Sequence, residues 1–142
     1  MRFLVMVMGG EDYEAGRMGT EEEFAAMTTF NEELVEAGVM LAGEGLHPTS
    51  KGVKVTFTGS EPIVTDGPFA EAKEFIAGYW VWKVDSLEDA VNWLKRAPFG
   101  PGANIQIRQI ADPDDYGDEL SPELRERERA VGEAAKKNVE NA

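Results

Sequence analysis

The chain has 142 residues with no cysteine, and its 27 acidic residues outnumber its 14 basic ones, for a formal charge of −13. That length predicts one domain with a tail, and the missing cysteine excludes disulfides and thiolate metal sites. The acidic excess, concentrated in residues 11–44 and in the tail, argues against a nucleic-acid-binding surface, which needs clustered Lys and Arg.

The first eight residues are apolar and predict a strand. Both faces of this strand need covering, because Phe3, Val5 and Val7 alternate with other apolar residues. The segment has no basic leader or cleavage site, and no hydrophobic run of the chain is long enough to span a membrane. We therefore expect a cytoplasmic protein with no membrane contact.

A helix is expected after the polar loop formed by residues 9–19. Thr20 and Glu23 have the spacing of a capping box at its start. Apolar residues then recur at helical spacing as far as Gly38, which suits a helix end because glycine tolerates the left-handed conformation.

Extended structure is expected next. A strand starting at residue 39 runs into Gly43-Glu44-Gly45, where two glycines allow a bend or a close approach of another backbone. Apolar and polar residues alternate over residues 53–64, which predicts a β-hairpin with one solvated face.

The hairpin leads to the turn Asp66-Gly67-Pro68-Phe69. We expect the Asp66 carboxylate to accept a hydrogen bond from the Phe69 N–H, because Pro68 has no N–H to donate. Residues 70–74 favour one short helical turn, in which Lys73 is an optional partner for Asp66.

The most apolar strand covers residues 75–84, with Trp80 and Trp82 on one of its faces. A second helix follows, capped near residue 86, and residues 104–110 predict the last strand.

The composition changes at residue 112 to charged, helix-favouring residues. Ser121 is a suitable cap for a tail helix, with Pro122 at its first position and only a thin apolar stripe along it. We therefore expect a domain over residues 1–111 and an acidic helical tail over residues 112–142.

The order of these elements predicts an α+β fold, a ferredoxin-like antiparallel sheet with both helices on one face and an inserted hairpin. Two helices cover only one side of such a sheet. The other side is expected to present Met and Trp mixed with Gln or Arg, so we predict a homodimer in which two sheets enclose a partly polar cavity.

His47 is the only imidazole of the chain. Glu44 precedes it by three positions, and a hairpin that begins just after it returns the chain to Asp66, so these three side chains are expected at one rim of the sheet. They are candidates for proton transfer on a small molecule held against Trp80 or Trp82. The alternative is that Asp66 caps its own turn while Glu44 and His47 are ordinary surface residues. The same three side chains could also hold a divalent metal, which is a minor alternative because no spacing matches an established metal-ligand pattern. Neither a metal nor another cofactor is therefore expected.

Three segments carry a resemblance to a known family: Gly43-Glu44-Gly45-Leu46, the run from Asp66 to Glu74, and the strand beginning at Gly78. The chain resembles the YCII-related family, in particular its DGPF-motif branch, from residue 1 to about residue 129. The resemblance implies a dimeric α+β barrel, cofactor-free acid–base chemistry with a paired histidine and aspartate, and a possible sigma-factor-linked context. Shorter members are similar in carrying the histidine in the first helix, where this chain has none.

Two hypotheses remain open. The first is a cofactor-free enzyme that performs proton transfer, elimination or isomerisation on a small polar or unsaturated acid, with His47, Asp66 and Glu44 as catalytic candidates and Phe69, Lys73, Trp80 and Trp82 as ligand-binding candidates. The second is a noncatalytic dimer that binds a ligand or a protein and in which the Asp-Gly-Pro-Phe turn is structural.

Overall fold

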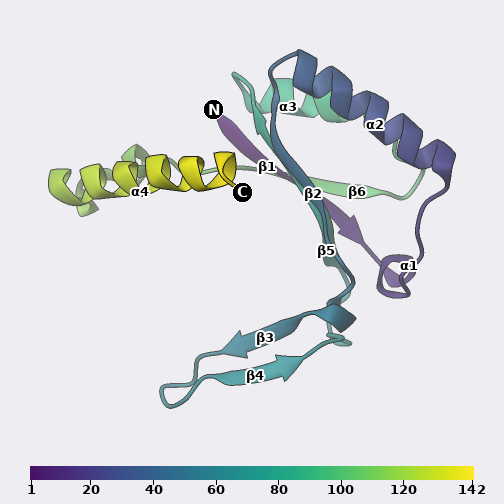
Figure 1. Cartoon of the computed structure of the whole chain (residues 1–142), viewed down its shortest axis with the longest axis horizontal. Helices are drawn as coiled ribbons and strands as arrows, with labels where there is room; N and C mark the ends of the chain where they lie inside the picture. Colours follow the sequence, from purple (N-terminus) through teal and green to yellow (C-terminus); the bar gives the residue numbers. More distant parts are fainter. The chain divides into compact units, whose positions relative to one another are not determined.

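The computed structural model of the protein describes residues 1–142 and contains two compact units, Met1–Gln109 and Ile110–Ala142 (Figure 1). The larger unit is a mixed α+β structure built on one four-stranded antiparallel sheet with strand order β2-β5-β1-β6. These strands are β1 (Arg2–Gly9), β2 (Met40–Gly45), β5 (Phe75–Lys83) and β6 (Asn104–Gln109). The apolar first strand is therefore central, flanked by β5 and β6.

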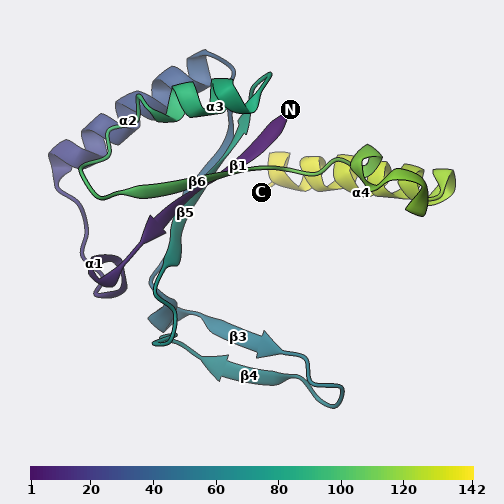
Figure 2. The same cartoon turned by 180° about the vertical axis from the view of Figure 1, so that it is seen from behind.

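Two longer helices, α2 (Glu21–Glu36) and α3 (Leu87–Leu94), pack on one face of this sheet (Figure 2). The Thr20 hydroxyl accepts from the N–H of Glu23 at 3.2 Å, which is one half of the predicted capping box, and the predicted cap at Ser86 is present, its hydroxyl accepting from the N–H of Asp89 at 3.1 Å. Gly38 follows the end of α2 with a φ of 74°, as its position after the apolar stripe predicted.

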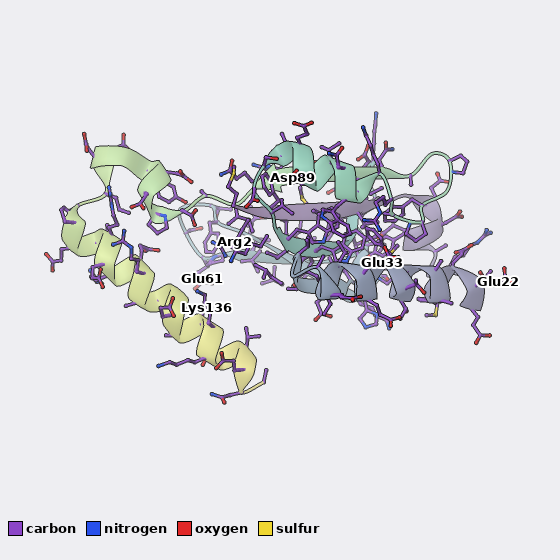
Figure 3. The ribbon with its side chains drawn as sticks, turned by 90° about the horizontal axis from the view of Figure 1, so that it is seen from above. Arg2, Glu22, Glu33, Glu61, Asp89 and Lys136 are labelled. Carbon is purple, nitrogen blue, oxygen red and sulfur yellow. The ribbon has the colours of Figure 1, made fainter.

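The core lies between these helices and the sheet (Figure 3). Trp82 is fully buried and Trp80 is 5% exposed, and their ring centroids lie 5.4 Å apart with Phe30 of α2 packed edge-on against both. The expectation that tryptophan would appear on the uncovered face of the sheet is therefore wrong. Trp80 and Trp82 lie on the same face of β5, because side chains alternate along a strand. That face packs against the helices, since burying these large side chains removes the most apolar surface from water.

The opposite face of the sheet carries the alternate residues of the same strands. Met6 stands between Tyr79 of β5 and Gln106 of β6, and Leu4 stands between Val81 and Arg108. Methionine, leucine and valine thus alternate here with polar groups, on the face where neither α2 nor α3 packs.

The predicted hairpin forms a separate two-stranded sheet of β3 (Val53–Thr56) and β4 (Ile63–Asp66). All its strand residues are exposed. Opposed residues share a face, and Val55 opposes Val64 while Val53 opposes Asp66. One face of the hairpin is therefore largely apolar.

Two local predictions were wrong. Residues 9–19 are not all loop, because α1 covers Glu11–Glu14. The helical turn expected over residues 70–74 is absent, and only the bond from the Ala72 N–H to the Phe69 carbonyl, at 3.1 Å, closes a turn there. A short 3₁₀ helix, η1 (Thr49–Lys51), precedes the hairpin.

The smaller unit holds a 3₁₀ segment, η2 (Pro113–Glu119), and the helix α4 (Pro122–Glu140). The Ser121 hydroxyl caps α4 by accepting from the N–H of Leu124 at 3.2 Å. Arg125 ties α4 to η2, since its guanidinium donates to Asp114 at 3.3 Å and to the Gly117 carbonyl at 2.7 Å. None of the helices combines the length and apolarity needed to cross a membrane.

Candidate functional site

A cavity of about 510 Å³ lies between α2 and the sheet. One face of α2 forms its roof, and the end of β2 and the first half of β5 form its floor. Most of its side chains are apolar or aromatic. The lining residues are Val7, Gly19, Glu23, Phe24, Met27, Asn31, Gly43, Glu44, Gly45, Ala77, Gly78, Tyr79, Trp80 and Phe99.

Trp80 is held in place in this cavity by three neighbours. Its indole N–H donates to the side-chain oxygen of Asn31 at 2.9 Å, and its ring contacts that of Phe99 edge-on at 6.1 Å between centroids. A Cβ on Gly43 would lie 2.8 Å from the indole Cδ1 atom, so the glycine leaves room for the ring against β2. Because the Asn31 oxygen faces the indole, its amide N–H groups remain as donors for a ligand.

The charged groups of the lining are all acidic. Its charged lining residues are Glu23 and Glu44, and no Lys, Arg or His lines the cavity. The Oε2 atom of Glu23 would lie 2.7 Å from a Cβ on Gly19, which places this carboxylate against the loop that leads into α2. Glu44 pairs with Tyr79 across β2 and β5, so its side chain projects on the opposite side of the sheet from Trp80.

The three predicted catalytic residues are all exposed. No hydrogen bond or ion pair joins His47, Asp66 and Glu44 to one another. Glu44 is the one of the three that lines the cavity. The structure of a single chain therefore does not bring them together as a catalytic group.

The Asp-Gly-Pro-Phe turn is bonded differently from the prediction. The Phe69 N–H donates to the Thr49 hydroxyl at 3.2 Å and not to Asp66, and the Gly67 N–H donates to the Gly52 carbonyl at 2.9 Å. The reason is that η1 and the residue after it bring two other acceptors, the Thr49 hydroxyl and the Gly52 carbonyl, within reach of these N–H groups.

The remaining ligand-binding candidates fall in two groups. Trp80 lines the cavity, whereas Trp82 is closed inside the core. Phe69 and Lys73 do not line this cavity. The ring of Phe69 is instead covered by the ammonium of Lys54, 4.6 Å from its centroid.

Sequence reasoning missed Tyr13 and Glu14 of α1. The Glu14 carboxylate accepts from both the N–H and the hydroxyl of Thr49, at 3.0 and 2.5 Å. The Tyr13 hydroxyl donates to the carbonyls of Leu46 and His47, and burial, followed by the charge of Glu14, raises the pKa of this phenol above 10.0. The one feature of the sequence that could have indicated these contacts is a tyrosine inside an otherwise polar segment. Together with the bond from the Phe69 N–H to Thr49, these bonds join α1, η1 and the Asp-Gly-Pro-Phe turn into one packed unit, which we call the corner.

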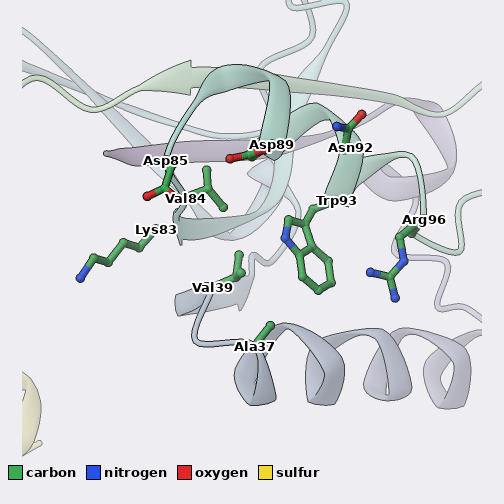
Figure 4. A pocket seen from close by; sticks show the side chains of 9 residues that line it. All are labelled: Ala37, Val39, Lys83, Val84, Asp85, Asp89, Asn92, Trp93 and Arg96. Carbon is green, nitrogen blue, oxygen red and sulfur yellow. The ribbon is translucent and has the colours of Figure 1, made fainter.

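A second, more polar cavity of about 360 Å³ lies between the end of α2 and α3 (Figure 4). Its Arg96 is already engaged, because the guanidinium binds Glu33 at 2.6 Å and stacks over the Trp93 ring at 4.5 Å. No three His, Cys, Asp or Glu side chains in the chain are grouped so that they could hold a metal ion.

The YCII-related domain model matches residues 1–113, the whole of the sheet with its two helices and the hairpin. The chain belongs to the YCII-related family. It is similar to an uncharacterised protein of Rhizobium meliloti (strain 1021), with 28% identity over 97 residues that cover 67% of this chain and 78% of the relative. The cavity beneath α2 lies wholly within the matched YCII-related domain.

Proposed function

We propose that this YCII-related protein binds a small, mainly apolar molecule in the cavity between α2 and the sheet. The observation that carries the proposal is the lining itself. Aromatic and aliphatic side chains surround about 510 Å³, and the amide of Asn31 offers hydrogen-bond donors among them. Cavities of about 300–1,000 Å³ with this mixture of many apolar and few polar groups are typical of small-molecule sites.

The proposal includes a homodimer of ferredoxin-like subunits, as expected for the DGPF-motif branch. Its support is the arrangement of apolar residues that neither α2 nor α3 covers. The sheet face opposite the helices carries Leu4, Met6 and Val81, and one face of the hairpin carries Val55 and Val64. An isolated two-stranded hairpin is only marginally stable in water, so packing against a second copy gives this one a stabilising contact.

Cofactor-free acid–base catalysis is a second candidate function. It is favoured by Glu44, a potential base whose residue borders the cavity and whose carboxylate projects from the opposite face of the sheet, the face that the proposed dimer would cover. In this version His47 and Asp66, which lie outside the cavity of their own chain, act across the dimer. Replacing Asp66 by Asn would then abolish turnover without loss of ligand binding, whereas a purely structural turn would leave both unchanged.

Calorimetric titration with cinnamyl alcohol tests the binding proposal. Phe24→Ala removes a ring from the lining and is expected to weaken binding roughly threefold to tenfold, through lost apolar contact. Val35→Ala is the matched control, since Val35 is an exposed apolar residue of the same helix outside the lining. Absent binding to the native protein, or equal binding to all three proteins, would refute the proposal.

A further inference from the structure

We infer that the cavity beneath α2 discriminates by charge: it accepts apolar amines, takes neutral alcohols less well, and rejects carboxylates and phosphates, with Glu23 setting the preference. This inference rests on the proposed function, because it specifies the class of ligand for the same site. The sequence led us to expect a small polar or unsaturated acid as the ligand, whereas the ligand inferred here carries the opposite charge.

The lining offers an anion no partner. On the helix side of the sheet, Glu23 is the charged side chain of the lining and Asn31 supplies its amide, without any Lys, Arg or His, while Glu44 and Tyr79 project from the opposite face. An anion that loses water on entering such a site gains no opposite charge in return, and uncompensated burial of a charge is costly.

The N-terminus of α2 does not supply the missing positive charge. Helix N-termini attract anions through the partial positive charge of their free N–H groups. Here the first turn holds Glu21, Glu22 and Glu23, and the Glu23 N–H is already bonded to Thr20. The carboxylates neutralise the helix end and leave the mouth of the cavity acidic.

The residues around the cavity add to its negative electrostatic potential. Residues 11–44, which include the whole of α2, hold ten acidic residues and one basic residue, Arg17. The guanidinium of Arg17 lies 3.5 Å from the carboxylate of Asp12, so its charge is partly balanced within α1 and the loop. A field of this sign lowers the local concentration of anions and raises that of cations.

The spacing along α2 fits a two-ended ligand. Glu23, Met27 and Asn31 follow one another at intervals of four and so line one face of the helix. Glu23 and Asn31 are eight residues apart, or about 12 Å along the helix axis. An amine at Glu23 therefore leaves the apolar body of a ligand beside Met27 and Trp80, in the direction of the Asn31 amide.

Three probes with one skeleton test the inference: cinnamylamine, cinnamyl alcohol and cinnamate. In calorimetric titrations at low salt, we expect the amine to bind roughly fivefold or more tightly than cinnamate, with the alcohol between them. The difference is expected to shrink at high salt, because exposed charges are screened.

The controls separate the charge of Glu23 from the overall charge of the chain. Glu23→Gln is expected to remove most of the difference in affinity between the amine and the alcohol, which is the quantity compared. Glu22 is exposed, as Glu23 is, but lies outside the lining, so Glu22→Gln loses the same charge from the same turn and is expected to keep the preference (Figure 3).

The outcomes separate this inference from the function on which it rests. Cinnamate that binds as tightly as the amine, or a preference equally reduced in both variants, would overturn the charge selection by Glu23 while leaving ligand binding intact. If none of the three probes binds, the proposed function itself is rejected, and the inference with it.

Discussion

The backbone of Gly67 lies so close to Thr49 that a Cβ on Gly67 would be 1.7 Å from the Thr49 carbonyl oxygen. The glycine of the Asp-Gly-Pro-Phe turn is therefore required by contact with η1. The same contact lets the Gly67 N–H reach the Gly52 carbonyl at 2.9 Å and the Phe69 N–H reach the Thr49 hydroxyl at 3.2 Å. The turn and the root of the hairpin form one packed unit.

Gly67→Ala is expected to destabilise the protein by about 2 kcal/mol or more, because the backbone of η1 must move to admit the methyl group. Urea unfolding followed by circular dichroism measures the loss. Gly10→Ala serves as control, since nothing lies within 4 Å of a Cβ at Gly10, and is expected to change stability by less than about 0.5 kcal/mol. Equal stability of the two variants would mean that the close contact is absent.

Thr49→Val tests the hydrogen bonds that the Thr49 hydroxyl makes in the corner. The substitution removes the donor to Glu14 and the acceptor for the Phe69 N–H, so we expect a loss of about 1–3 kcal/mol and faster hydrogen exchange at Phe69. Thr49→Ser keeps the hydroxyl and is expected to restore most of the stability. A valine variant as stable as the native protein, with Phe69 still protected, contradicts the bonding described.

The contribution of Tyr13 to the stability of the folded protein is expected to depend on pH in the alkaline range. Its pKa is raised, so the folded state favours the neutral phenol, and the stabilisation is complete below the ordinary pKa of 10.0 and lost as the pH rises through the raised value. Tyr13→Phe is expected to cost about 0.5–1.5 kcal/mol at neutral pH. The gap between the two proteins is expected to narrow in strongly alkaline solution, and a constant gap would show that Tyr13 does not contribute this dependence.

The proposed dimer predicts that one face of the hairpin is sensitive to charge. Val55→Glu places a carboxylate on the face shared by Val53 and Val64, and is expected to shift the protein from dimer to monomer in sedimentation velocity. Thr56→Glu adds the same charge to the opposite face and is expected to leave the dimer intact. A monomeric native protein, or identical behaviour of the two variants, contradicts this assembly.

The sequence predicted the elements of the larger unit well, because their signals are local. Thr20, Ser86 and Gly38 mark helix ends through their own backbone preferences, and the alternation in residues 53–64 is that of a hairpin. The helices α2 and α3 pack on one face of the antiparallel sheet, as expected of the α+β class.

The candidate site was harder to predict, because it depends on contacts between distant residues. The Asp66 carboxylate was the nearest acceptor for Phe69 in sequence, but Thr49, twenty positions away, takes the bond. Alternation showed that Trp80 and Trp82 share a face but not which face the helices cover. The cavity residues Phe24, Asn31 and Gly43 come from separate segments whose proximity only the folded chain shows.

The most direct test of the ligand site uses the three tryptophan side chains of the protein, Trp80, Trp82 and Trp93. Each indole N–H gives one signal in a ¹H–¹⁵N correlation spectrum, and only Trp80 lines the cavity beneath α2. On titration with cinnamylamine, we predict that the Trp80 signal moves in a saturable way while those of Trp82 and Trp93 stay in place. A spectrum in which Trp80 does not move, or in which Trp93 of the second cavity moves alone, would contradict the account.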